Sequence, residues 1–204
     1  MTSPPQWIVG RNQAWRGNFR VRYWSREWQE IIYSGPQSYL EAVIDAGFDG
    51  VYLDNVDTYH ELSAENPQAK AQMIAFVTAL AQAARTKRPR FKIVVQNAEE
   101  LLAEPEYLAA LDAIAKEDLL FGIQGDGVRN RPGDISHSIE YLEIARRHDK
   151  PVFVVEYLEP AAAAAARDEL RQHGFIPYFA ERLLDRAPHD PAASRMPSRR
   201  GNSN

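Results

Sequence analysis

Apolar positions along the chain follow two alternating spacings. Short runs of β-branched and aromatic residues alternate with longer segments in which apolar residues recur every three or four positions. The short runs predict six strands: Gln6–Val9, Gly50–Asp54, Lys92–Gln96, Ala113–Glu117, Pro151–Tyr157 and Phe175–Phe179. This alternation is typical of repeated βα units around a parallel sheet.

The longer segments predict helices with recognisable ends. Proline favours the first helical position, whereas glycine and basic residues favour the C-terminal end. Gly35 and Pro36 divide the segment between Ser25 and Ala46 into two shorter helices. Three further helices are predicted. The first is capped by Asn66, has Pro67 at its first position and carries Met73, Val77, Leu80 and Ala84 on one face. The second contains Ile135, Ile139 and Leu142 and ends at Arg146–His148, and the third runs from Pro160 through Ala161–Ala166 and is ended by Gly174.

The number of strands limits the fold. Six strands do not close an eight-stranded (β/α) barrel, so either the sheet is open or two strands are missing. We predict one α/β domain over residues 1–186. Residues 187–204 are rich in Pro, Ser, Arg and Asn and are predicted to form a disordered tail.

Charge and hydropathy exclude several classes of partner. The 204 residues include 24 Lys and Arg against 28 Asp and Glu, a formal net charge of −4, and the basic residues are spread along the chain apart from a short run near its C-terminus. We therefore expect no nucleic-acid partner. No run approaches the roughly 18 apolar residues of a membrane span, and the N-terminal residues lack the charged-then-apolar order of a signal peptide.

Motifs for metals and cofactors are absent from the sequence. Without cysteine the chain has no disulfides and no thiolate chemistry. The five histidines are His60, His137, His148, His173 and His189. They lack HxH or HExxH spacing, so we expect no metal. A P-loop, GxGxxG and GxSxG are also missing, so nucleotide-binding and serine-hydrolase functions lack their motifs. Carboxylates, histidines and hydroxyls remain as the sources of chemistry.

Polar side chains follow four successive predicted strands. Asp54 ends the first of these, Gln96 and Asn97 the second, Glu117 the third, and Glu156 with Tyr157 the fourth. Side chains alternate along a strand, so Asp54 shares a face with Tyr52. The carboxyl ends of parallel strands form the active-site face of βα folds. We expect these groups at one rim.

An acid after a strand is also often the N-cap of the next helix, at about even odds for any single position. Asp57 is the better N-cap candidate after its strand, which leaves Asp54 free. Of the neighbours Glu117 and Asp118, one can cap while the other faces the cleft, and we assign the cleft to Glu117.

Two carboxylates across a cleft are what glycosidic hydrolysis requires: one protonates the leaving oxygen, and the other attacks the anomeric carbon or activates water. We therefore predict that Asp54 and Glu117 are catalytic. Amides suited to sugar hydroxyls are those of Asn55, Gln96 and Asn97. Aromatic candidates for sugar rings are Tyr23, Tyr52, Tyr59, Tyr157, Trp15 and Trp24, although core packing is the commoner role for each alone. With Asp57 and Glu156, the rim is acidic and attracts a cationic glycan.

Four segments resemble the endo-α-1,4-polygalactosaminidase-like glycoside hydrolases of the family 114 type, particularly their bacterial and archaeal branch: Val21–Trp24, Gly47–Asp57, Val94–Asn97 and Ala115–Asp118. The resemblance covers about Trp7 to Leu184, and GFDGVYLDNVD is its most specific part. It implies a TIM-like (β/α)8 barrel that hydrolyses a galactosamine-containing polysaccharide without a cofactor. It also implies a secreted or cell-envelope location.

The same resemblance assigns catalysis to Asp54 and Glu117. Characterised members typically have Pro before the Asp and Asn before the Glu, where this chain has Leu53 and Lys116. This departure bears on the substrate more than on the chemistry. The family also has two strands upstream, so the barrel is expected to lack its first two strands here, and the chain alone is expected to be a poor enzyme.

Two other functions compete with an endo-acting glycosidase. The first is a non-catalytic carbohydrate-binding barrel module, which the missing strands favour and the presence of both Asp54 and Glu117 disfavours. The second is a purely structural βα domain. The sequence does not indicate the oligomeric state of the protein.

Overall fold

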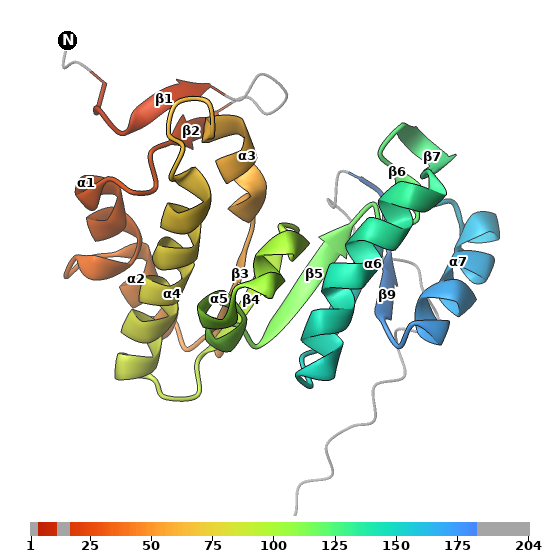
Figure 1. The fold of residues 1–204 in the computed structure, drawn as a ribbon. Coiled ribbons are helices and arrows are strands. Elements are labelled where there is room, and N and C mark those ends of the chain that lie inside the picture. The colour runs from red at the N-terminus through yellow and green to blue at the C-terminus, as the bar shows by residue number, and fades with distance from the viewer. Residues whose placement is uncertain (1–3, 12–16, 183–204) are drawn as a thin grey trace, which may run out of the picture.

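The computed structural model describes residues 4–11 and 17–182. The predicted tail at 187–204 and the candidate Trp15 lie outside these residues. Within the described part, the fold is a central parallel sheet with helices packed against it (Figure 1). The predicted α/β class is therefore confirmed.

The central sheet contains five parallel strands in the order β3-β4-β5-β8-β9. Their bounds are Gly50–Leu53 for β3, Lys92–Gln96 for β4, Ala113–Glu117 for β5, Val152–Glu156 for β8 and Ile176–Phe179 for β9. Five of the six predicted strands are thus present, each within about two residues of its predicted ends. Among the described residues the sheet is open, with β3 at one edge and β9 at the other.

The first predicted strand, Gln6–Val9, was wrongly placed in this sheet. Its residues contribute to β1 (Ile8–Arg11), which pairs antiparallel with β2 (Phe19–Val21). A short connection permits antiparallel pairing, whereas a parallel pair needs a long crossover, and here only a few residues separate the two strands. A second antiparallel ribbon, β6 (Phe121–Gly122) with β7 (Gly125–Arg129), was not predicted because its glycines interrupt any alternating pattern.

Helices and short helical turns connect the strands. Their bounds are α1 (Arg26–Gln29), η1 (Glu30–Ser34), α2 (Tyr39–Asp45), η2 (Val56–Thr58), α3 (Tyr59–Leu62), α4 (Ala69–Lys87), η3 (Glu99–Ala103), α5 (Pro105–Ala110), α6 (Pro132–Arg147) and α7 (Pro160–Gln172). The predicted break at Gly35 is confirmed, and Ser38 caps α2 by accepting from the Glu41 N–H at 3.4 Å. Gly174 takes a left-handed φ of +71° after α7, as a helix end requires.

The start of α4 was predicted too early. Asn66 is not its N-cap, because the helix begins at Ala69 after Gln68. The Asn66 side chain instead accepts from the Gln68 N–H at 3.0 Å, closing a turn ahead of the helix. Pro67 lies in this turn and not in the helix.

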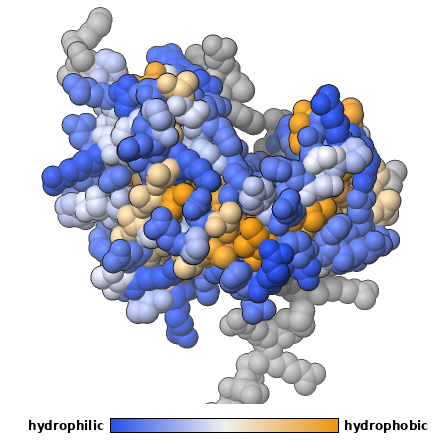
Figure 2. Space-filling model, viewed as in Figure 1, coloured by the Kyte–Doolittle hydropathy of each residue, from blue (hydrophilic) through white to orange (hydrophobic). Residues whose placement is uncertain are grey.

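The core lies between the sheet and its helices. Met73, Val77, Leu80 and Ala84 of α4 are all buried, as predicted. Strand residues Ile93, Val95, Ile114, Val152 and Val154 are at most 1% exposed. Figure 2 shows a largely hydrophilic outer face with hydrophobic residues gathered in its middle, over α5 and α6. Each fully buried aliphatic side chain contributes roughly 1.5 to 3 kcal/mol, so this layer fixes where the strand ends lie.

We expect Gly50→Ala to destabilise the fold by about 2 kcal/mol, because a Cβ there would lie 2.5 Å from the Lys92 carbonyl oxygen on the paired strand. Chemical denaturation measures the change. Gly133→Ala is the matched control, since its Cβ meets nothing within 4 Å. Equal stability of the two variants would contradict the close approach of β3 to β4.

Candidate active site

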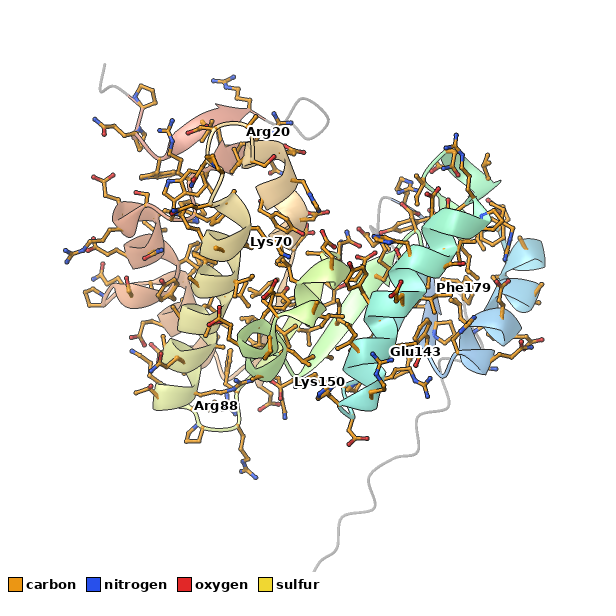
Figure 3. All side chains as sticks on the ribbon, in the orientation of Figure 1. Arg20, Lys70, Arg88, Glu143, Lys150 and Phe179 are labelled. Carbon is orange, nitrogen blue, oxygen red and sulfur yellow. The ribbon has the colours of Figure 1, made fainter. Side chains whose placement is uncertain are left out.

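The carboxyl end of β5 points to the end of the molecule that carries both antiparallel ribbons (Figure 1). Since the other strands of the sheet run parallel to β5, they end on the same side. In Figure 3, Arg20 of β2 lies at this end, and Arg88 and Lys150 lie at the opposite end. The rim described below is therefore a single edge of the sheet.

Asp54 is held in place by the residue that follows it. Asn55 adopts a left-handed φ of +60°, a conformation that Asn tolerates better than most residues. In this conformation its N–H donates to Asp54 Oδ1 at 2.7 Å, and its Nδ2 donates to Asp54 Oδ2 at 3.0 Å. The side chain of Asp54 is therefore oriented by local backbone geometry while it remains exposed.

Asp57 is not the N-cap that the sequence suggested. It lies within η2, and α3 begins at Tyr59 without any side-chain cap. Burial raises the pKa of the Asp57 carboxyl, and the nearby charge of Asp54 adds to this while Lys116 opposes it. Asp57 is therefore a partly buried acid beside Asp54.

Glu117 is surrounded by hydrogen-bond donors from two neighbouring strands. Gln96 Nε2 and Asn97 Nδ2 donate to its Oε2, and the Tyr157 hydroxyl donates to its Oε1. Asn97 also accepts from the Glu117 N–H at 3.0 Å, with a left-handed φ of +59°. Three side-chain donors thus converge on the Glu117 side chain and fix its orientation.

One amide joins the two predicted catalytic residues. Gln96 Nε2, which donates to Glu117, also donates to Asp54 Oδ1 at 3.3 Å. Tyr52 lies near the same pair: burial raises its pKa to about 12, and the charges of Glu117 and Asp54 add to the increase. The structure thus brings Asp54, Glu117, Gln96, Asn97 and Tyr157 together, with Tyr52 beside them.

Three predicted contact residues are buried. Tyr23 is 3% exposed and its hydroxyl donates to the Ala69 carbonyl oxygen at 2.7 Å. Tyr59 is 4% exposed and donates to Glu100. Glu156 is fully buried. Glu156 is therefore not on the exposed rim where the sequence placed it. Tyr23 and Tyr59 present no exposed ring face, although Tyr23 lines the cavity described below. Trp24 packs edge-on against Tyr23.

Strand alternation explains the position of Glu156. It follows Val152 and Val154 on the helix-covered face of β8, while Tyr157 follows Phe153 and Val155 on the other. The Glu156 carboxylate accepts from the Leu120 N–H at 2.6 Å and the Phe121 N–H at 3.3 Å. It therefore stabilises the turn after β5 from the buried face of the sheet. Its spacing from the two valines indicates that face.

A cavity of about 970 Å³ lies beside Asp54. It runs between the β1–β2 ribbon, the end of β3 and α4, and its walls include Trp28, Phe19 and Tyr52. Glu117 is not among its lining residues. The cavity therefore approaches the carboxylate pair from the Asp54 side.

Lys116, one of the two departures from the family pattern, forms a buried ion pair. Its Nζ lies 3.5 Å from Glu99 Oε1 of η3, and Ser138 of α6 also donates to Glu99. The two charged side chains are only 14% and 10% exposed. Because η3 begins directly after Asn97 and Ala98, this pair fixes the segment that presents Asn97 to Glu117.

We expect Lys116→Met to lower the free energy of unfolding by about 2 kcal/mol, because it leaves the Glu99 charge buried with only a hydroxyl donor. Denaturant titration measures the loss. The double variant Lys116→Met with Glu99→Gln should recover part of it. If the double variant is less stable than the single one, the buried charge is not the cause.

No group of side chains suited to a metal ion occurs in the part of the chain that the structure describes. Among the same residues, no helix is long and apolar enough to cross a membrane.

Solved structures of glycoside hydrolases share this fold. The chain superimposes on the glycoside hydrolase domain of PelA from Pseudomonas aeruginosa with a TM-score of 0.69 and 20% identity, over 87% of this chain and 69% of that one. It superimposes on Ega3 from Aspergillus fumigatus, solved in complex with galactosamine, with a TM-score of 0.65 and 21% identity, over 88% and 66%.

Sequence relatives extend beyond this chain. It is 38% identical over 186 residues to an uncharacterised protein of Deinococcus radiodurans, covering 89% of this chain and 57% of the relative. It is 32% identical over 204 residues to uncharacterised protein MJ1477 of Methanocaldococcus jannaschii, covering 91% and 56%. The chain therefore spans little more than half the length of these relatives. The sequence profile of the glycoside-hydrolase family GH114 matches residues 1–193, and the chain belongs to that family.

Proposed function

We propose that this chain carries the catalytic carboxylates of a glycoside hydrolase and that these are Asp54 and Glu117. The observation that carries the proposal is the shared donor: Gln96 Nε2 contacts an oxygen of each carboxylate. A single amide between two acids at the carboxyl ends of parallel strands leaves them facing one space. Such a pair supplies the acid and the nucleophile or base that glycosidic cleavage needs.

The shared amide also bears on stereochemistry. The two oxygens can be no farther apart than two hydrogen-bond lengths placed end to end. This close approach of one oxygen from each group favours the shorter carboxyl separation of retaining glycosidases, roughly 5 to 5.5 Å, over the roughly 6.5 to 9.5 Å of inverting ones. We therefore propose retention of configuration, with a covalent glycosyl intermediate.

The proposed substrate is a galactosamine-containing or related amino-sugar polysaccharide, cleaved internally. Membership of GH114 and the fold shared with Ega3, solved with galactosamine, support this choice. Around the carboxylate pair, Asn55, Gln96 and Asn97 offer amides, Tyr52 and Tyr157 offer rings, and Asp57 adds negative charge. A cationic glycan suits this composition.

A non-catalytic carbohydrate-binding module remains the second candidate. The open sheet favours it, because the edges of β3 and β9 present backbone groups without strand partners among the described residues. Such edges also favour self-association over a stable, active monomer. The hydrogen-bonded carboxylate pair favours catalysis.

A reducing-end assay on a panel of amino-sugar and neutral polysaccharides separates the two functions. It should use this chain and the full-length Deinococcus radiodurans relative side by side, since the chain covers 57% of that protein. We expect the relative to release oligosaccharides from a galactosamine polymer and this chain to release fewer. Binding without release by both proteins would overturn the catalytic proposal and establish the second.

A further inference from the structure

Arg182, just beyond β9, ties together three segments of the rim. Its Nη1 and Nη2 contact the two carboxylate oxygens of Asp118 at 3.1 Å each, and its Nε contacts Asp126 Oδ1 at 2.7 Å. Asp118 follows β5, and Asp126 lies in β7. The fork of the guanidinium matches this bidentate geometry, which a lysine does not reproduce.

The same guanidinium covers Tyr157. Its central carbon lies 4.4 Å from the centre of the Tyr157 ring, within the range of a cation–π contact. The hydroxyl at the other end of that ring donates to Glu117 Oε1. Arg182 therefore packs on the face of the Tyr157 ring, and the hydroxyl of the same ring contacts Glu117, one of the two carboxylates.

The anchor for Arg182 is built into the backbone. Asp118 has a left-handed φ of +52°, and its N–H donates to the Val155 carbonyl oxygen at 3.0 Å. The Asp118 carbonyl oxygen accepts from Asn130 Nδ2 at 2.7 Å. Gly122 lies so close that a Cβ there would be 2.2 Å from Asp118 Oδ1. An isolated exposed ion pair contributes little, but here a fixed carboxylate meets a fully engaged guanidinium.

We propose that Arg182 is a positioning residue for Glu117, acting through Tyr157. This inference rests on the proposed function in that it takes Glu117 as catalytic. Arg182 fixes the tilt of the Tyr157 ring, and the ring directs its hydroxyl to Glu117. We call the contacts of Arg182 with Asp118, Asp126 and the Tyr157 ring the clamp. Without the clamp the ring turns, and Glu117 loses one of the three side-chain donors that orient it. A misplaced catalytic group costs on the order of tenfold to a hundredfold in rate.

The inference is tested by measuring the kinetics of Arg182→Met, Tyr157→Phe and the double variant in the whole 204-residue chain. We expect Arg182→Met to lower kcat about tenfold or more with KM within about twofold, because orientation affects the chemical step more than binding. In the Tyr157→Phe background it should lower kcat little further, since the hydroxyl that it positions is gone. Arg182→Lys, which keeps the charge without the fork, should fall between wild type and Arg182→Met, and it replaces Arg182→Met if that variant fails to fold.

Arg129→Met is the matched control. Arg129 also has a carboxylate partner, Glu169 at 2.6 Å, and lies over an aromatic ring, Phe121 at 5.4 Å, but it contacts neither Tyr157 nor Asp118 in these interactions. We expect it to keep wild-type kcat. Additive kcat losses for Arg182→Met and Tyr157→Phe, or an equal loss in Arg129→Met, would overturn the inference.

A spectroscopic measurement decides the inference independently of turnover. With tyrosine labelled at Cζ, the carbon resonance that disappears in Tyr157→Phe belongs to Tyr157. We expect this resonance to shift in Arg182→Met and Arg182→Lys and to stay in place in Arg129→Met. An unchanged resonance in both Arg182 variants would overturn the inference even where hydrolysis is present. A shifted resonance with full turnover in Glu117→Gln would uphold the clamp and overturn the proposed function instead.

Discussion

Asp54→Asn and Glu117→Gln are each expected to lower kcat about a thousandfold while leaving the fold intact. Each amide is nearly isosteric with the acid that it replaces, but it neither accepts a proton nor attacks the anomeric carbon, and acid–base catalysis contributes roughly 10² to 10⁴ in rate. The measurement is steady-state hydrolysis of the substrate identified in the glycan panel. It requires whichever protein, this chain or the longer relative, is active.

The controls for these variants are Asp168→Asn and Glu140→Gln, which make the same chemical changes at exposed positions on α7 and α6. They should keep wild-type kcat. Melting temperatures should be similar for all four variants, since neither Asp54 nor Glu117 lies in the apolar core. Near wild-type turnover in both Asp54→Asn and Glu117→Gln would refute the assignment of the pair.

The second large effect is on stability and concerns Glu156. Burial raises the pKa of this carboxyl from 4.5 to about 7, although the Leu120 and Phe121 N–H groups oppose the shift. A raised pKa means that the folded protein binds the proton more tightly than the unfolded chain does. Its stabilising contribution is complete below about pH 4.5 and is lost as pH rises through about 7. The loss amounts to about 3 kcal/mol.

Glu156→Gln isolates this contribution, because other carboxyls titrate in the opposite sense. The pKa values of Asp112 and Glu100, for example, are lowered by their hydrogen-bond partners, despite the opposing effect of burial. Denaturation at pH 4.5 and pH 8 should show wild type losing about 3 kcal/mol relative to Glu156→Gln between the two conditions. Glu140→Gln, at an exposed site, should lose stability in parallel with wild type. A constant difference between wild type and Glu156→Gln would contradict the raised pKa.

Sequence reasoning located the catalytic candidates because two local rules were sufficient. Period-two alternation indicated the face of β3 that carries Tyr52 and Asp54, and the βα pattern indicated that strand ends share a rim. The same rules indicated Glu117 and Asp118 at the end of β5, and Glu117 was assigned to the cleft. What no local pattern encodes is that Gln96 lies between the two acids, because that depends on the pairing of β4 with β3 on one side and β5 on the other.

Three other features were not predicted correctly from the sequence, each for a physical reason. Arg182 lies 64 residues from Asp118, so nothing in its own neighbourhood indicates the clamp. Glu156 was assigned to the rim because it ends a strand, although its alternation with Val152 and Val154 places it on the buried face. Strand β1 was counted with the sheet because a short apolar run does not reveal its pairing partner. Long-range pairing therefore accounts for Arg182 and β1, whereas the alternation that places Glu156 on the buried face was already present in the sequence.

Covalent trapping identifies which carboxylate of the protein attacks the sugar. A galacto- or gluco-configured amino-cyclitol epoxide, which reacts with the nucleophile of a retaining glycosidase, is incubated with the active protein, and the labelled peptide is identified by mass spectrometry. We predict one label, on Asp54 or Glu117, that is lost when the labelled residue is replaced by its amide. A stoichiometric label on any other carboxylate, or release of product with inverted configuration and no label, would rule out Asp54 and Glu117 as the catalytic pair of a retaining enzyme.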